Sequence, residues 1–96
     1  MSLSRPSSVT LTSTTKQTFN VIPVGDTIAS QAWTIINVSG TSTPAPTVTP
    51  GTDQADEARA QVNMNSATVG SVWLLQAVLT GSGGDVRAAR IYIRVI

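Results

Sequence analysis

The sequence predicts an all-β domain, an antiparallel β-sandwich of about seven short strands. Apolar and polar residues alternate with a period of two through most of the chain, and turn-forming residues recur at short intervals. A short helical turn over residues 54–59 is the one helical alternative. A chain of 96 residues forms a single domain with one core. We therefore expect residues 1–8 to form a flexible N-terminal arm and residues 9–96 to form one sandwich domain.

The first two expected strands are short. Val9–Thr12 alternates and predicts a strand at the edge of a sheet. Lys16–Ile22 alternates again, with Phe19 and Val21 on one face. Pro23 ends this second strand, because proline cannot donate a hydrogen bond to a neighbouring strand.

The middle of the chain combines a strand with a proline-rich stretch. Ile28–Val38 predicts a strand with Trp33 and Ile35 on one face and Ile36 on the other. Thr41–Gly51 contains three prolines, which favour extended backbone over helix. We interpret it as a long connection between strands, the alternative being an exposed loop that contacts a partner.

The last third of the chain predicts three more strands. Ala58–Asn65 alternates small apolar residues with polar ones. Val72–Thr80 and Val86–Ile96 are joined by Gly81–Asp85, whose glycines suit the positive φ angles of a tight hairpin. The first arm of this hairpin is apolar on both faces. It is therefore either covered on both sides or presents an apolar surface to another protein.

The expected core consists of the apolar residues that share one face of their strands, with the two tryptophans as its centres. The residues are Phe19, Trp33, Ile35, Trp73, Leu75, Ile91 and Ile93.

Composition excludes several classes of function. The chain has no cysteine and no histidine, so disulfides, thiol catalysis and a Ser-His-Asp triad are impossible. Zinc, copper and haem sites of the usual kinds are disfavoured, and we expect no cofactor or metal. The net charge of +1 indicates neither nucleic acid nor an anionic membrane as partner. No apolar run approaches the ~20 residues needed to span a bilayer, and Met1–Thr15 lacks the apolar region of a signal peptide.

Two clusters could suggest chemistry. Asp53, Asp56 and Glu57 lie close together, but their spacing does not match a calcium loop. A solvated charge group is favoured over general acid/base catalysis. Gly81–Gly84 lacks the Lys-Ser/Thr ending of a phosphate loop and leads into a strand, so it is interpreted as a hairpin turn.

The arginines of the last strand are the best candidates for an interface. Arg90 and Arg94 lie on the same side, with Tyr92 between them. Arginine and tyrosine are enriched at binding hot spots. The alternative is an exposed face whose charges discourage edge-to-edge aggregation. The expected interface adds Leu74 and Val78, which lie on the second apolar face of Val72–Thr80.

Five segments resemble a family of small structural proteins of tailed bacteriophages, the fiber-tail adaptor or neck proteins. They are Gly25–Ser30, Trp33–Ile35, Gly70–Trp73, Asp85–Arg87 and Arg90–Val95. Trp73 stands where the family has tyrosine, and the turn before Arg87 is longer and richer in glycine. Residues 41–53 are also longer and richer in proline than the family pattern. The resemblance implies an immunoglobulin-like sandwich without catalytic residues.

The expected function is therefore a non-enzymatic component of the virion, assembled in the host cytoplasm. It would form a homo-oligomeric ring or repeated array at the neck or tail, bridging to fibers or other virion proteins. One alternative is a capsid decoration protein. Another, of a different class, is a carbohydrate- or host-surface-binding module, in which Tyr92 or Trp33 would line a groove. Neither nucleic acid nor a membrane is an expected partner.

Overall fold

The computed structural model describes residues 7–21, 27–51 and 57–96, and within these ranges it contains seven strands and no helix. The all-β prediction is therefore confirmed. The strands are β1 (Ser7–Leu11), β2 (Lys16–Val21), β3 (Ile28–Ser39), β4 (Thr47–Pro50), β5 (Ala58–Asn63), β6 (Val72–Gly81) and β7 (Val86–Val95).

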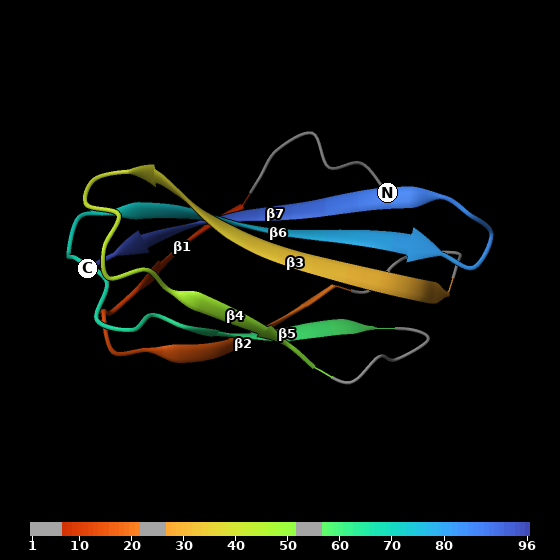
Figure 1. The fold of residues 1–96 in the computed structure, drawn as a ribbon, viewed down its shortest axis with the longest axis horizontal. Helices are drawn as coiled ribbons and strands as arrows, with labels where there is room; N and C mark the ends of the chain where they lie inside the picture. The colour runs from red at the N-terminus through yellow and green to blue at the C-terminus, as the bar shows by residue number, and fades with distance from the viewer. Residues whose placement is uncertain (1–6, 22–26, 52–56) are drawn as a thin grey trace.

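The strands form two sheets stacked as a sandwich (Figure 1). The larger sheet has four strands in the order β1-β7-β6-β3, and the smaller has three in the order β2-β5-β4. All strand pairs are antiparallel except β1 and β7, which are parallel. β1 runs diagonally from the larger sheet toward β2, so it connects the two layers along one side (Figure 1).

The core lies between the two sheets, and alternation within each strand decides which residues enter it. In β5 the residues Ala58, Ala60 and Val62 are buried, whereas Arg59 and Gln61 point to solvent. In β6 every odd-numbered residue from Trp73 to Leu79 is buried. The remaining buried hydrophobic residues are Leu11, Met64, Ala67, Ile93 and Val95.

The residues expected in the core fall into two groups. Trp73, Leu75 and Ile93 are fully buried. The other four are partly buried and pack against the main core cluster, namely Phe19, Trp33, Ile35 and Ile91. Trp33 also packs against the second cluster, formed by Ala58, Ala77 and Leu79. It therefore joins the two halves of the interior.

The prediction that Thr41–Gly51 is a long connection between strands is wrong for the last part of this segment. Thr47–Pro50 forms β4, which pairs with β5 along Ala60–Asn63. A strand with proline at its end is possible here because β4 lies at the edge of its sheet and need not donate hydrogen bonds on both sides.

Two expected boundaries also change. β1 begins at Ser7, so Ser7 and Ser8 belong to a strand instead of the N-terminal arm. The remainder of that arm, residues 1–6, lies outside the described residues. β5 ends at Asn63, two residues before the expected end, because residues 65 and 66 take positive φ angles in a turn.

Candidate interaction surface

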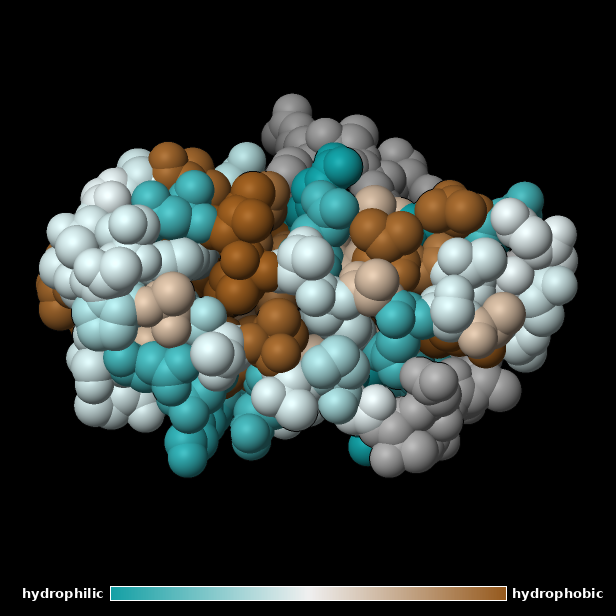
Figure 2. Space-filling model, viewed as in Figure 1, coloured by the Kyte–Doolittle hydropathy of each residue, from teal (hydrophilic) through white to brown (hydrophobic). Residues whose placement is uncertain are grey.

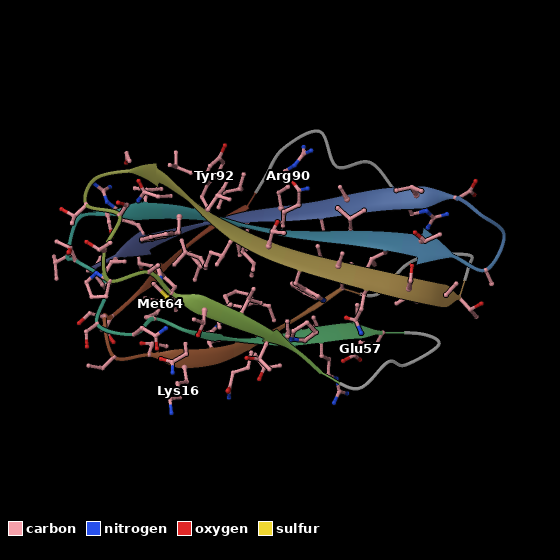
Figure 3. All side chains as sticks on the ribbon, viewed as in Figure 1. Lys16, Glu57, Met64, Arg90 and Tyr92 are labelled. Carbon is pink, nitrogen blue, oxygen red and sulfur yellow. The ribbon has the colours of Figure 1, made fainter. Side chains whose placement is uncertain are left out.

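The five residues expected at an interface all lie on the outer face of the four-stranded sheet, the face that points away from the smaller sheet. Figure 3 shows the side chains of Arg90 and Tyr92 pointing outward from β7, while Lys16 points outward from the opposite sheet. The strand register explains this placement, because the even-numbered residues of β6 and β7 stand opposite one another. These include Leu74, Val78 and Arg94.

An apolar row crosses this outer face. Leu74 on β6 stands directly opposite Tyr92 on β7 and, on its other side, opposite Ile36 on β3. Side chains directly opposite each other on one face of a sheet contact across the strands. Val78 lies in a separate row on the same face, between Ala32 and Ala88. The structure thus groups Leu74 with Tyr92 and places Val78 four residues further along β6.

Two hydrophobic residues on β3 enlarge this surface, and sequence reasoning had not assigned them to it. Ile36 is 56% exposed and Val38 is 49% exposed. Figure 2 shows brown apolar residues on the side of the sandwich along which β3 and β4 run in Figure 1, whereas the outer face of the four-stranded sheet points upward in this view. The alternation within Ile28–Val38 had separated Ile36 from the core-facing Trp33 and Ile35. That alternation was the signal in the sequence that could have assigned Ile36 to the outer face.

The arginines flank the apolar row. Arg90 stands opposite Gln76 and donates a hydrogen bond from Nε to Gln76 Oε1 at 2.9 Å. Arg94 stands opposite Val72, and both line a shallow hollow of about 710 Å³ together with Ser8, Thr10 and Tyr92. Tyrosine and arginine beside exposed aliphatic side chains form the composition typical of a protein-binding surface.

The anti-aggregation interpretation fits only one of the two arginines. Arg94 stands opposite Thr10 of β1, so it lies inside the sheet and does not protect an edge. Arg90 precedes the first residue of β7 that pairs with β1, which is Ile91. Arg90 therefore lies where the edge of β7 has no strand partner among the described residues, and a charge at that position discourages aggregation.

Trp33 and Tyr92 do not form a common aromatic groove. Trp33 lies on the inner side of the sheet, where its Nε1 donates to Gln31 Oε1 at 2.7 Å. Tyr92 lies on the outer side. The hollow beside Tyr92 contains no second aromatic residue. A groove lined by paired aromatic rings is thus absent from the described part of this face.

Of the acidic cluster, only Glu57 lies in the described part of the chain, since Asp53 and Asp56 lie outside it. The Glu57 carboxylate accepts a hydrogen bond from Arg59 Nε, and the two form an ion pair (Figure 3 labels Glu57). This hydrogen bond lowers the pKa of Glu57 below its usual value. The interaction is structural and local, because it joins Glu57, the residue before β5, to Arg59 within β5. Among the described residues, no group of acids is arranged to hold a metal ion.

The lowered pKa of Glu57 has a consequence for stability. The folded state binds the Glu57 proton less tightly than the unfolded state, so the ionised carboxylate stabilises the fold above its ordinary pKa of 4.5. This contribution is lost as the pH falls through the lower, folded-state pKa. We expect the stability difference between the wild type and Glu57→Gln to shrink between pH 6 and pH 3, measured by urea unfolding. A difference that stays constant over this range would show that the ion pair adds nothing in solution.

Comparison with protein-family models, with curated proteins and with solved structures gave no match. In the part of the chain that the structure describes, no helix is long and apolar enough to cross a membrane.

Proposed function

We propose that this chain is a non-enzymatic structural protein of a bacteriophage virion, an adaptor at the neck or tail that binds other virion proteins through the outer face of its four-stranded sheet. The observation that carries the proposal is the composition of that face. It combines exposed Ile36 and Val38 with Leu74, Tyr92 and the two arginines, and no described element covers it.

The topology supports the immunoglobulin-like part of the proposal. In an immunoglobulin constant domain, strands C, F and G form one sheet, while strands B, E and D are neighbours in the other. Numbered by their order in this chain, those groups correspond to β3-β6-β7 and β2-β5-β4, which is the observed arrangement. The resemblance of Gly25–Ile96 to phage adaptor proteins supplies the setting, and it implies assembly of several copies.

The size and chemistry of the surface suit assembly with protein. Its apolar row is a few residues wide and is flanked by arginines. The row does not form a deep pocket. Repeated contacts of this kind are individually weak and become stable when several copies bind a symmetric partner. The net charge of +1 and the small number of charged residues do not favour nucleic acid as the partner.

The first test is the copy number of the chain in purified particles of the phage that encodes it, measured by quantitative mass spectrometry against the major capsid protein. We expect on the order of a dozen copies per particle, as for a cyclic ring. Hundreds of copies would instead indicate a capsid decoration protein. Absence from the particle would overturn the virion proposal and favour a free binding module.

The surface is tested separately by substitution. We expect the triple variant Arg90→Ala, Tyr92→Ala, Arg94→Ala to lower incorporation into particles at least ten-fold, because each lost hot-spot contact costs roughly 1–2 kcal/mol. The matched control is a triple alanine variant on the outer face of the other sheet, at Lys16, Thr18 and Gln61. Equal incorporation of both variants would show that the outer face of the four-stranded sheet is not the interface.

A further inference from the structure

Among the described strands, β3 forms a long sheet edge without the features that usually protect one. It borders the four-stranded sheet and pairs with β6 on one side. Its twelve residues, Ile28–Ser39, include no proline and no charged residue. Proteins usually protect an edge with a short strand, a proline, a lysine or a bulge. The register irregularities of β3 lie near its two ends, so Ser30–Asn37 pairs regularly with β6.

The edges of the smaller sheet differ from β3 in this respect. β4 is only four residues long and ends in Pro50. β2 begins with Lys16, whose side chain points away from the core (Figure 3). A short strand, a proline and a lysine all discourage pairing with another strand. Because β3 has none of these, we expect its edge to be covered when the chain is assembled.

The hydrogen-bond register shows which main-chain groups of β3 point toward its open side. Gly81 N donates to Asp85 O in the β6–β7 hairpin, so the odd-numbered residues of β6 bond to β7 and the even-numbered ones bond to β3. Even-numbered residues of β3 stand opposite these, which leaves its odd-numbered residues directed outward. From residue 33 to residue 38, the outward residues are Trp33, Ile35 and Asn37. Within the described part of the chain, no main-chain hydrogen bond reaches them from the open side.

The side chains along this edge are apolar on both faces of the sheet. Ile36 and Val38 are exposed on the outer face. Ile35, on the inner face, packs against the core but is only partly buried. Figure 2 shows apolar residues on this side of the sandwich, along which β3 and β4 run in Figure 1. A strand added beside β3 would therefore remove apolar surface from water as well as pair the main chain.

The spacing of the outward residues indicates a second copy of the chain as the added strand. Trp33 and Asn37 lie at equal distances on either side of Ile35. A second copy turned by 180° about an axis through Ile35 presents the same residues in antiparallel order. Ile35 then pairs with its own copy, and Trp33 pairs with Asn37 of the second copy. This arrangement forms about six main-chain hydrogen bonds, two for each bonded pair.

The side chains and the charge agree with this pairing. Directly opposite side chains of an antiparallel pair share one face, so Ile36 would contact Thr34 of the second copy on the outer face. Ile36 would then be covered on both sides, because Leu74 already stands opposite it within its own chain. β3 has no charged residue and the chain has a net charge of +1, so two copies repel each other only weakly. The same lack of charge gives β3 little with which to select a strand of a different protein.

We propose that two copies of this chain pair through the open side of β3, antiparallel and centred on Ile35, so that their two four-stranded sheets join into one continuous sheet. The proposal rests on the described edge of β3 and does not depend on the virion proposal. If both hold, the particle contains an even number of copies of the chain.

The mass of the isolated chain in solution tests the pairing directly. Sedimentation equilibrium at about 0.1 mM, where mass action favours association, should give twice the chain mass of 10.0 kDa. A monomer at this concentration, or an oligomer larger than a dimer, would overturn the proposal. Neither result would affect the virion proposal, which is tested by copy number and incorporation in particles.

A charge on the edge should separate the two copies. We expect Ile36→Lys to raise the dissociation constant of the dimer by about ten-fold or more, because both copies lose an apolar contact and gain a protecting lysine. The matched control is Val69→Lys, since Val69 is also exposed but lies between β5 and β6, away from β3. It should leave the dissociation constant unchanged. Urea unfolding of each variant checks that the fold is kept, and a dimer that Ile36→Lys leaves intact would overturn the proposal.

Disulfide cross-linking tests the register of the pair, and the absence of cysteine from the chain makes its outcome unambiguous. In the proposed pairing, residue 34 of one copy stands opposite residue 36 of the other, with Cα atoms about 4.5 Å apart. A disulfide can bridge this distance. The double variant Thr34→Cys, Ile36→Cys should therefore form a covalent dimer when diamide oxidises it. Neither single variant should do so, because each cysteine then lies opposite a residue without a thiol.

A second pair of cysteines controls for random collision. Lys16→Cys with Thr18→Cys has the same spacing on β2, which is also at the edge of its sheet. This variant should stay monomeric on a non-reducing gel after the same oxidation. Equal cross-linking of the β2 and β3 variants would overturn the proposal. A covalent dimer of the single variant Ile36→Cys would overturn the register centred on Ile35, because residue 36 would then lie opposite its own copy.

Discussion

Replacing Trp73 with alanine is expected to remove most of the stability of the domain. The side chain is only 3% exposed and belongs to the main core cluster with Met64, Leu75 and Ile93. Truncating a buried tryptophan costs about 3–5 kcal/mol, whereas a small domain has a total of roughly 5–15 kcal/mol. We expect urea unfolding, followed by circular dichroism, to show a loss in this range and a Tm lower by more than about 12 °C.

Two variants separate the contributions of Trp73. Its Nε1 donates a hydrogen bond to Ser71 Oγ at 3.0 Å. Trp73→Phe keeps an aromatic ring but leaves this hydroxyl without its donor, so it should cost less than Trp73→Ala. Trp33→Ala is the second comparison. Because Trp33 is only partly buried, this substitution should also lower the free energy of unfolding by less than Trp73→Ala does. If Trp73→Ala destabilised the chain by under about 1 kcal/mol, the indole would not be a core residue in solution.

The strands that the sequence predicted best are those whose two faces differ in polarity. β5 alternates alanine and valine with arginine and glutamine, and each apolar residue is buried as the pattern required. The C-terminal hairpin was equally evident, because glycines and an aspartate separate two apolar strands. In both cases the information is local. A period of two and a turn between strands do not depend on what lies elsewhere in the fold.

β4 was missed because the signals that indicate it are not local. Thr47–Pro50 is short and lies among prolines, and it becomes a strand because β5 offers it an edge. The parallel pairing of β1 with β7 joins residues more than eighty positions apart. Periodicity says which face of a strand is apolar, but it does not say which strand lies next to it.

The candidate surface was predicted in part for the same reason. Alternation placed Leu74 and Val78 on one face of β6. It likewise placed Arg90, Tyr92 and Arg94 together on one face of β7. That these two sets share one sheet face follows from the hairpin register, which the short turn fixes. The contribution of Ile36 depends on β3 pairing with β6, a contact between distant segments. The apolar second face of β6, interpreted as either covered or presented to a partner, has no covering element among the described residues.

The second large effect is expected from Gly40→Ala, at the end of β3. Gly40 has a φ of +80°, a conformation that costs a residue with a side chain about 1–2 kcal/mol. A Cβ there would also lie 2.9 Å from the Ser71 Cα, a main-chain atom that cannot rotate away. Overpacking of this kind adds about 1–3 kcal/mol. We expect the free energy of unfolding to fall by about 2–5 kcal/mol in urea unfolding.

Ser71 explains why this contact cannot relax easily. Its side chain is buried, donates from Oγ to Thr68 O at 2.6 Å and accepts the hydrogen bond of the Trp73 indole. Its main-chain oxygen also accepts from Val95 N at 3.0 Å. Moving Ser71 away from a methyl group at residue 40 would disturb all three bonds, and with them the end of β7.

Gly84→Ala is the matched control for this variant. Gly84 has a similar φ of +92°, but a Cβ there would have nothing within 4 Å. Its substitution should therefore cost only the conformational part, about 1–2 kcal/mol. The difference between the losses of unfolding free energy in the two variants measures the cost of the close approach of residue 40 to Ser71. Equal losses in both would mean that the end of β3 stands further from Ser71 in solution, because only the backbone conformation would then matter at either glycine.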